Sequence, residues 1–215
     1  MCGRFTLDGI DQLEKRYDTK LPDNISSSYN IAPGQLILTL VKNSPLKFKE
    51  MKWGIIPSWS KSEKVHFSNI NSRKENLLQS RVYSSLLANK RCLIPASGFY
   101  EWKKNKNTKI PYYFTLKNHE IFSFAGLYDI WSNGENYFFS CSIITKPASH
   151  NISHIHHRMP AILDKEGEQL WLDSKYTEDK LLKLLDASKK NIDYYKVSLG
   201  VNNPNNNSSS LINKI

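Results

Sequence analysis

Apolar residues recur along this chain with two different periods. These periods predict short helices near both ends and many strands between them. Near the N-terminus apolar residues recur three or four positions apart, so residues from about 8 to 18 are expected to form an amphipathic helix. The apolar run 36–41 predicts a buried strand, and Met51 and Trp53 alternate with polar neighbours on a second strand. Apolar positions at helical spacing then predict a helix from about 74 to 87.

Strands dominate the middle of the chain. Short segments rich in β-branched and aromatic residues, separated by turn residues, predict strands at 92–94, 99–102, 112–116, 121–128 and 137–144. In the C-terminal part, the pattern predicts helices near 166–172 and from Thr177 onward. A last strand at 194–199 and a polar Asn/Ser-rich loop at 202–210 are expected to follow.

The whole chain, residues 1–215, is expected to fold as one domain, because no linker separates stretches of different pattern and no internal repeat is visible. Many short strands with helices at intervals favour the α+β class. We expect a curled, barrel-like, mainly antiparallel β-sheet core with several flanking helices. A doubly wound parallel sheet is disfavoured, because the strands do not alternate regularly with helices.

The net charge narrows the choice of partner. Thirty Lys and Arg against twenty Asp and Glu leave a formal charge of +10. This excess favours a polyanionic partner, with nucleic acid first and an anionic membrane surface second. Charge alone also fits a basic protein that has no partner.

Cysteine usage points to a reducing, intracellular compartment. The three cysteines, Cys2, Cys92 and Cys141, are an odd number at wide spacing and form neither a disulfide framework nor a CxxC metal motif. The first residues lack the apolar run of a signal peptide, and no apolar run approaches the length of a membrane span. We therefore expect no membrane association, and a location in the cytoplasm or nucleoid, or in the nucleus of a eukaryote.

Cys2 is the first candidate for chemistry. If Met1 is removed, Cys2 carries a free α-amine and a β-thiol, which together can form an imine with an aldehyde and then close a thiazolidine ring. An α-amine titrates near about 7.7–8.0 and a thiol near about 8.5, so both have a reactive fraction at neutral pH. The alternative is that Cys2 is a small residue in a frayed terminus.

Glu101 is the second candidate. In the segment 98–102, strand alternation places Phe99 and Glu101 on one face and Tyr100 and Trp102 on the other. A carboxylate beside a large aromatic side chain is a candidate for a raised pKa and for acid/base catalysis. The alternative is an exposed glutamate at the end of a strand.

A histidine-rich run supplies the third candidate. His150, His154, His156 and His157 fall within eight residues, which is compatible with metal binding. No nearby cysteine or carboxylate completes such a site, so an acid/base histidine beside a phosphate-contacting Arg158 is at least as economical.

Further residues suit contact with a nucleic acid. Asn71 offers both a donor and an acceptor, and Arg73 can bind a phosphate in a bidentate manner. Arg81 lies two turns further along the predicted helix, roughly on the same face. Trp59 is followed by a polar, lysine-containing segment and is expected to be exposed as a stacking surface, whereas Trp53 is expected in the core. The alternative for residues 71–73 is a helix-capping segment with solvated arginines.

Six short motifs now define a resemblance. They are MCGRF at 1–5, YNIAPG at 29–34, WGIIPSW at 53–59, NSRKE at 71–75, GFYEW at 98–102 and IHHRMP at 155–160. In this order they resemble the SOS response-associated peptidase (SRAP) family nearly from end to end. Each motif is weak by itself, but six in order are highly specific.

The resemblance implies a protein that detects abasic sites in single-stranded DNA. Cys2 matches the family cysteine that forms the thiazolidine crosslink with the ring-opened sugar, and Asn71 matches the asparagine that hydrogen-bonds the ring. Glu101 matches a glutamate that shuttles protons and is implicated in removing the initiator residue. His156 matches a histidine that assists imine chemistry and crosslink reversal. The implied activity is that of a lyase-like, self-reacting enzyme that removes its own Met1.

Other implications concern binding. The family positions that contact DNA fall on Arg4, Asn30, Pro33, Trp59, Arg73 and Arg81. We expect a monomer without cofactor or resident metal.

Two departures from the family pattern stand out. His157 replaces the Asp that commonly follows the histidine, which bears on the tuning of His156 and on crosslink reversal. Ser72 replaces a usual alanine, and we expect this change to be tolerated.

Two other functions remain open from the residues. One is a peptidase or amidohydrolase with Cys2 as N-terminal nucleophile and its α-amine as base. The other is a non-covalent reader of modified bases in DNA, in which Cys2 is incidental.

Overall fold

Five strands of the computed structural model pair in a closed ring and form a barrel. The structure describes residues 2–42, 45–63, 69–106, 108–186 and 192–215. The barrel strands are β3 (Leu36–Val41), β4 (Lys47–Trp53), β6 (Arg91–Ala96), β9 (Phe122–Ser132) and β10 (Tyr137–Pro147). Neighbours around the ring pair antiparallel, except that β10 pairs with β4 in parallel. This arrangement confirms the predicted curled, mainly antiparallel sheet.

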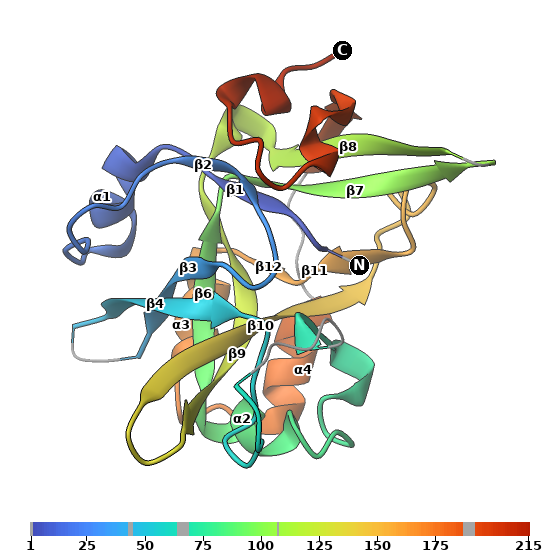
Figure 1. The fold of residues 1–215 in the computed structure, drawn as a ribbon. Helices are drawn as coiled ribbons and strands as arrows, with labels where there is room; N and C mark the ends of the chain where they lie inside the picture. The colour runs from blue at the N-terminus through green and yellow to red at the C-terminus, as the bar shows by residue number, and fades with distance from the viewer. Residues whose placement is uncertain (1, 43–44, 64–68, 107, 187–191) are drawn as a thin grey trace.

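A second sheet of five strands lies against one end of the barrel, in the upper half of Figure 1. Its strands, in spatial order, are β13 (Ile192–Lys196), β8 (Thr108–Leu116), β7 (Gly98–Asn105), β1 (Phe5–Leu7) and β2 (Ser28–Ile31). Three short strands extend the barrel sheet: β5 (Asn71–Arg73), β11 (Arg158–Pro160) and β12 (Ile162–Leu163).

The helices are short and flank the sheets. They are α1 (Leu13–Tyr17), α2 (Ser84–Asn89), α3 (Lys165–Leu172) and α4 (Glu178–Asp186). The helix α3 packs on β6 and β9, and α2 contacts the same two strands. The predicted helices near 166–172 and after Thr177 are confirmed as α3 and α4, and the α+β class is confirmed with them. Within the described ranges, no helix is long and apolar enough to cross a membrane.

An aromatic cluster joins the two sheets. The ring of Phe5 on β1 lies edge-on to Trp53 of the barrel at 5.2 Å and to Phe124 at 5.8 Å, measured between ring centroids. Trp53 is wholly buried, as predicted, and its indole N–H donates to the carbonyl of Ile70 at 2.9 Å. Edge-to-face pairs of this kind add to the stabilisation from burial itself, so the start of the chain is firmly attached to the barrel.

The chain passes from the barrel to the second sheet at Ser97. The backbone N–H of Ser97 donates to the carbonyl of Thr6 at 2.9 Å, and the hydroxyl of Thr6 lies 2.9 Å from that of Tyr113. A Cβ at Gly98 would lie 2.2 Å from the ring of Tyr113, so only glycine fits there. This close packing sets the direction in which β7 leaves the barrel, and with it the position of Glu101.

The predicted helix from about 74 to 87 is wrong in its first half. The segment begins with a 3-10 turn at Lys74–Asn76, and the α-helix α2 begins only at Ser84. The hydroxyl of Ser80 accepts a hydrogen bond from the backbone N–H of Val82 at 3.3 Å, which competes with helical bonding. Leu78, one of the apolar residues whose spacing suggested the helix, is 37% exposed.

The C-terminal segment is exposed, as expected of a polar loop, but it is firmly bonded to the second sheet. The side-chain amide of the buried Asn30 donates to the carbonyls of Asn203 and Asn206, both at 2.9 Å, and to that of Val201 at 3.3 Å. Asn207 accepts a hydrogen bond from the backbone N–H of Tyr29 at 2.6 Å. The preceding strand begins at residue 192 instead of 194.

We predict that Asn30→Ala lowers the free energy of unfolding by about 2 to 4 kcal/mol, because three backbone carbonyls lose their donor at a buried position. Chemical denaturation followed by tryptophan fluorescence measures the effect. The matched control is Asn205→Ala, whose exposed side chain makes no hydrogen bond among the described residues. An equal loss in both variants would contradict this role of Asn30.

Candidate active site

Cys2 is buried and held by a side chain from a distant part of the chain. It is 0% exposed, and its backbone carbonyl accepts a hydrogen bond from the side-chain amide of Asn71 at 2.8 Å. The thiol lies 3.9 Å from the carbonyl of Arg4, to which it donates. Cys2 is therefore fixed in the fold, and the alternative of a frayed residue is wrong.

Asn71 owes its position to the barrel. It begins β5, which pairs in parallel with β10 through Asn71 and Ile143. The preceding Ile70 accepts two hydrogen bonds at its carbonyl, from the indole of Trp53 at 2.9 Å and from the backbone of Ile143 at 3.1 Å. The sequence placed this segment just ahead of a predicted helix, with a helix-capping segment as the alternative. It is instead a short strand, and its first side chain donates to the carbonyl of Cys2.

Glu101 and His156 meet in the same region. Glu101 lies on β7 and is 3% exposed, and His156 lies in the loop before β11. The Nδ1 atom of His156 is 3.6 Å from Oε1 of Glu101. Together with Lys103, Lys104, Lys109 and others, the two residues line a cleft of about 710 Å³.

Burial shifts the protonation of both groups toward their neutral forms. It raises the pKa of Glu101 to about 7 and lowers the pKa of His156 to about 4. The contact between them is therefore not an ion pair at neutral pH, although its distance is within the range of one. Glu101 is instead balanced between its acid and base forms near pH 7, which suits a group that must both accept and donate protons.

The same region disfavours ionisation of the Cys2 thiol. Burial raises its pKa well above the usual range, and the negative charge of Glu101 raises it further. The thiol therefore stays protonated at neutral pH and needs a neighbouring base in order to react. Glu101 is close enough to influence its ionisation and is the candidate for that base.

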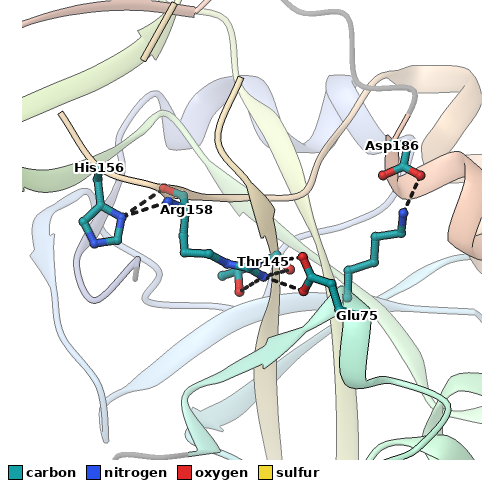
Figure 2. A network of polar contacts seen from close by, with 6 residues as sticks. Glu75, Thr145, His156, Arg158 and Asp186 are labelled. Carbon is teal, nitrogen blue, oxygen red and sulfur yellow. Dashed lines mark hydrogen bonds and ion pairs between the residues drawn. The ribbon is translucent and has the colours of Figure 1, made fainter. Parts of the chain in front are cut away.

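A buried arginine fixes the orientation of His156 (Figure 2). The guanidinium of Arg158 donates to both carboxylate oxygens of Glu75, at 2.7 and 3.0 Å, and to the carbonyl of Thr145 at 2.7 Å. The backbone N–H of Arg158 donates to Nδ1 of His156 at 3.1 Å. Nδ1 also lies 3.2 Å from the carbonyl oxygen of Arg158, so the backbone of Arg158 holds the ring at Nδ1 in either tautomer.

This network corrects the interpretation of Arg158 as a phosphate contact. Its residue exposure is 8%, and its guanidinium is directed at Glu75 and away from solvent. The role of Glu75 was not predicted from the sequence. Its neighbour Lys74 forms an ion pair with Asp186 of α4, which is labelled in Figure 2. The NSRKE motif contained Glu75, but its partner lies more than eighty residues away and only the fold brings them together.

The residues predicted to contact DNA divide into two groups. Arg4 and Asn30 are tied to the protein, because the guanidinium of Arg4 donates to Asn30 at 2.9 Å and to the carbonyl of Val201 at 2.6 Å. Asn30 is 2% exposed, while Pro33 is partly exposed on the turn after β2. Contact of Arg4, Asn30 and Pro33 with DNA stays a prediction.

The second group is open to solvent. Trp59 is 61% exposed, as predicted, and the guanidinium of Arg81 lies over its ring at 5.4 Å from the centroid. Arg73 is exposed at the end of β5. Trp59 and Arg81 are 22 positions apart in the sequence, but the fold places the cation over the exposed indole ring. Contact of Trp59, Arg73 and Arg81 with DNA stays a prediction.

The histidine run is not gathered into a metal cluster in the described parts of the chain, where no three His, Cys, Asp or Glu side chains are placed to hold an ion. The ring of His157 instead packs on that of His156, with centroids 4.5 Å apart. His154 contacts the ring of Tyr194.

Comparison with known proteins identifies the family. Residues 1–204 match the family described as SOS response associated peptidase (SRAP). The chain is 42% identical over 223 residues to the Abasic site processing protein YoqW of Bacillus subtilis (strain 168), with 99% of each chain covered. The chain belongs to the SRAP family.

More distant relatives agree with this assignment. The Abasic site processing protein HMCES of Xenopus tropicalis is 33% identical over 219 residues, which cover 86% of this chain and 65% of HMCES. The solved structure of a protein from Bacteroides thetaiotaomicron has a TM-score of 0.89 at 24% identity over all of both chains, and it supports the fold alone.

We predict that Glu101→Gln makes the protein relatively more stable as pH rises. A carboxyl whose folded pKa is raised holds its proton more tightly in the folded state, so wild-type stability falls between the unfolded value of 4.5 and about 7. Relative to the variant, wild type should lose about 3 kcal/mol between pH 4.5 and pH 8. Denaturant titrations across this range measure the difference.

Glu75→Gln is the matched control, because its sign is opposite. The hydrogen bond from Arg158 lowers the pKa of Glu75, so its contribution is present above pH 4.5 and is lost as pH falls through the folded pKa. Wild type should thus gain stability relative to this variant as pH rises toward about 4.5 and should change little above it, so the titrations for this control extend below pH 4.5. A flat difference for Glu101→Gln would show that the carboxyl is not held in its neutral form by burial.

Proposed function

We propose that this protein processes abasic sites in single-stranded DNA and attaches itself to them covalently through Cys2, once Met1 has been removed. Met1 lies outside the described residues. Relatives named as abasic site processing proteins support the choice of lesion. An abasic site opens to an aldehyde, and a terminal cysteine is the residue best suited to capture an aldehyde.

One observation carries the proposal: the carbonyl of the fully buried Cys2 is bonded to Asn71 at 2.8 Å. A frayed residue would spend little time in any one orientation, and its two nucleophiles would have to find the aldehyde by chance. A residue held at its carbonyl presents the nitrogen and the sulfur in a fixed direction, which removes much of the entropic cost of reaction.

The proposed reaction balances without a cofactor. The α-amine of Cys2 adds to the aldehyde carbon of the ring-opened sugar, and loss of water leaves an imine. The thiol sulfur then adds to the imine carbon, and the thiol proton passes to the nitrogen. The product is a thiazolidine, and the adduct has the mass of protein plus DNA minus one water.

Glu101 and His156 provide for the proton transfers in this scheme. Glu101, with a pKa of about 7, takes a proton from the attacking amine or thiol and returns it to the departing hydroxyl. His156 is neutral at pH 7 and is held at Nδ1 by the backbone of Arg158, so its ring can exchange a proton with a sugar oxygen. The same groups catalyse the reverse reaction, which would release the DNA slowly.

Preference for single strands follows from the exposed pair Trp59 and Arg81. An unpaired base can stack on the indole, whereas a paired base in a duplex keeps its faces covered. The formal charge of +10 adds a salt-dependent attraction to phosphates.

We predict that protein beginning at Cys2 gains the mass of the DNA minus water when it is incubated with single-stranded DNA that carries one abasic site. Intact mass after heat denaturation measures the adduct. Cys2→Ala should give no heat-stable adduct, although its free amine still forms an imine that borohydride traps, because only the thiol closes the ring.

Blocking the amine provides the second control. A variant with extra residues before Cys2 keeps the thiol but has no α-amine at that position, and it should form no adduct. A heat-stable adduct on this blocked protein would contradict the thiazolidine. Cleavage of amide substrates without any DNA adduct would favour the N-terminal-cysteine hydrolase, and binding without an adduct would favour the non-covalent reader.

A further inference from the structure

The cleft that contains Glu101 and His156 extends beyond them along β7. Among the described residues, this strand pairs with β1 at Gly98 and Phe99, and its residues 101–104 line the cleft together with the loop 153–157. The cleft walls carry Lys103, Lys104 and Lys109 from the β7–β8 hairpin. Glu101 is the only acidic residue among its lining residues.

The arrangement of these lysines lowers the stability of the folded protein. Lys104 and Lys109 stand directly opposite each other in the β7–β8 register, and like charges in such a pair destabilise a sheet. In the parts of the chain that the structure describes, neither of them nor Lys103 forms an ion pair with a carboxylate. A bound polyanion would remove this repulsion.

Aromatic rings lie among these charges. Trp102 lines the cleft and is fixed by a hydrogen bond from its indole N–H to the side chain of Asn202 at 2.8 Å. His154 and His157 line the opposite wall, where His154 packs edge-on to Tyr194 with centroids 5.6 Å apart. Lysines interleaved with fixed, partly open rings are the combination that binds unpaired nucleotides.

We propose that this cleft, named here the lysine cleft, holds the single-stranded DNA on one side of the lesion, while the strand on the other side passes over Trp59 and Arg81. The proposal rests on the proposed function and adds to it a second binding site. The three lysines contact phosphates, and the rings of Trp102 and His157 contact bases.

The position of the two surfaces supports this division. The lysine cleft is lined by residues of β7, β8, the loop 153–157 and Asn202, and it shares no residue with the Trp59–Arg81 surface. In Figure 1 the β7–β8 hairpin projects at the upper right, and α2, which follows Arg81, lies at the bottom. Glu101 and His156 are themselves among the residues that line the lysine cleft, so a strand that reaches them enters this cleft.

The test uses oligonucleotides with a tetrahydrofuran analogue of the abasic site at one end, so that each probe has a flank on the 5′ or the 3′ side only. The double variant Lys104→Ser/Lys109→Ser should bind one of these probes roughly tenfold more weakly and leave the other nearly unchanged. For the affected probe, the slope of log affinity against log salt should fall by about 1.4, since two phosphate contacts are lost. Trp59→Ala should weaken the other probe.

The matched control removes the same charge elsewhere. Lys15→Ser/Lys20→Ser changes two exposed lysines near α1, on the other side of the molecule from the β7–β8 hairpin. An equal loss in this control, or an equal loss for both probes in the cleft variant, would overturn the proposal. The probes have no aldehyde, so the result is independent of the covalent chemistry, and failure of the crosslink would be seen separately in the mass measurement.

Discussion

The site depends on one hydrogen bond, from the side chain of Asn71 to the carbonyl of Cys2. It joins the start of the chain to a strand that is itself fixed by the barrel, through Ile70, Trp53 and Ile143. Without it, the backbone of Cys2 would be positioned only through the residues that follow it, Arg4 and Phe5, which are attached to the rest of the fold. The barrel thus limits the directions in which the reacting atoms of Cys2 can point, as a rigid loop does for other nucleophiles.

Burial makes the side chains of the site reactive and also lowers the stability of the folded protein. A carboxyl that is 3% exposed, a thiol that is wholly buried and a neutral histidine are all kept from their charged forms by the same lack of water. The stability lost at Glu101 is offset elsewhere, by the aromatic cluster around Phe5 and by the C-terminal carbonyls that Asn30 binds.

Much of the fold could be predicted from the sequence, because strand and helix periodicities are local properties. The strands from 91 to 147, the helices α3 and α4, buried Trp53 and exposed Trp59 all follow from such patterns. The break in the predicted helix after Lys74 does not follow from periodicity, because a side-chain hydrogen bond such as that of Ser80 to the backbone N–H of Val82 competes with helical bonding without changing the apolar pattern. The role of Arg158 was misjudged for another reason: its partner Glu75 is remote in sequence, and long-range pairing leaves no local signal.

The covalent mechanism requires that one carbon of the lesion becomes bonded to both the nitrogen and the sulfur of Cys2. Carbon-13 NMR of the complex, with the label at C1′ of the abasic sugar, observes this atom directly. We expect a single resonance in the range of a saturated carbon that carries nitrogen and sulfur. A resonance in the imine range, or one that still belongs to the free sugar, would show that the thiazolidine does not form.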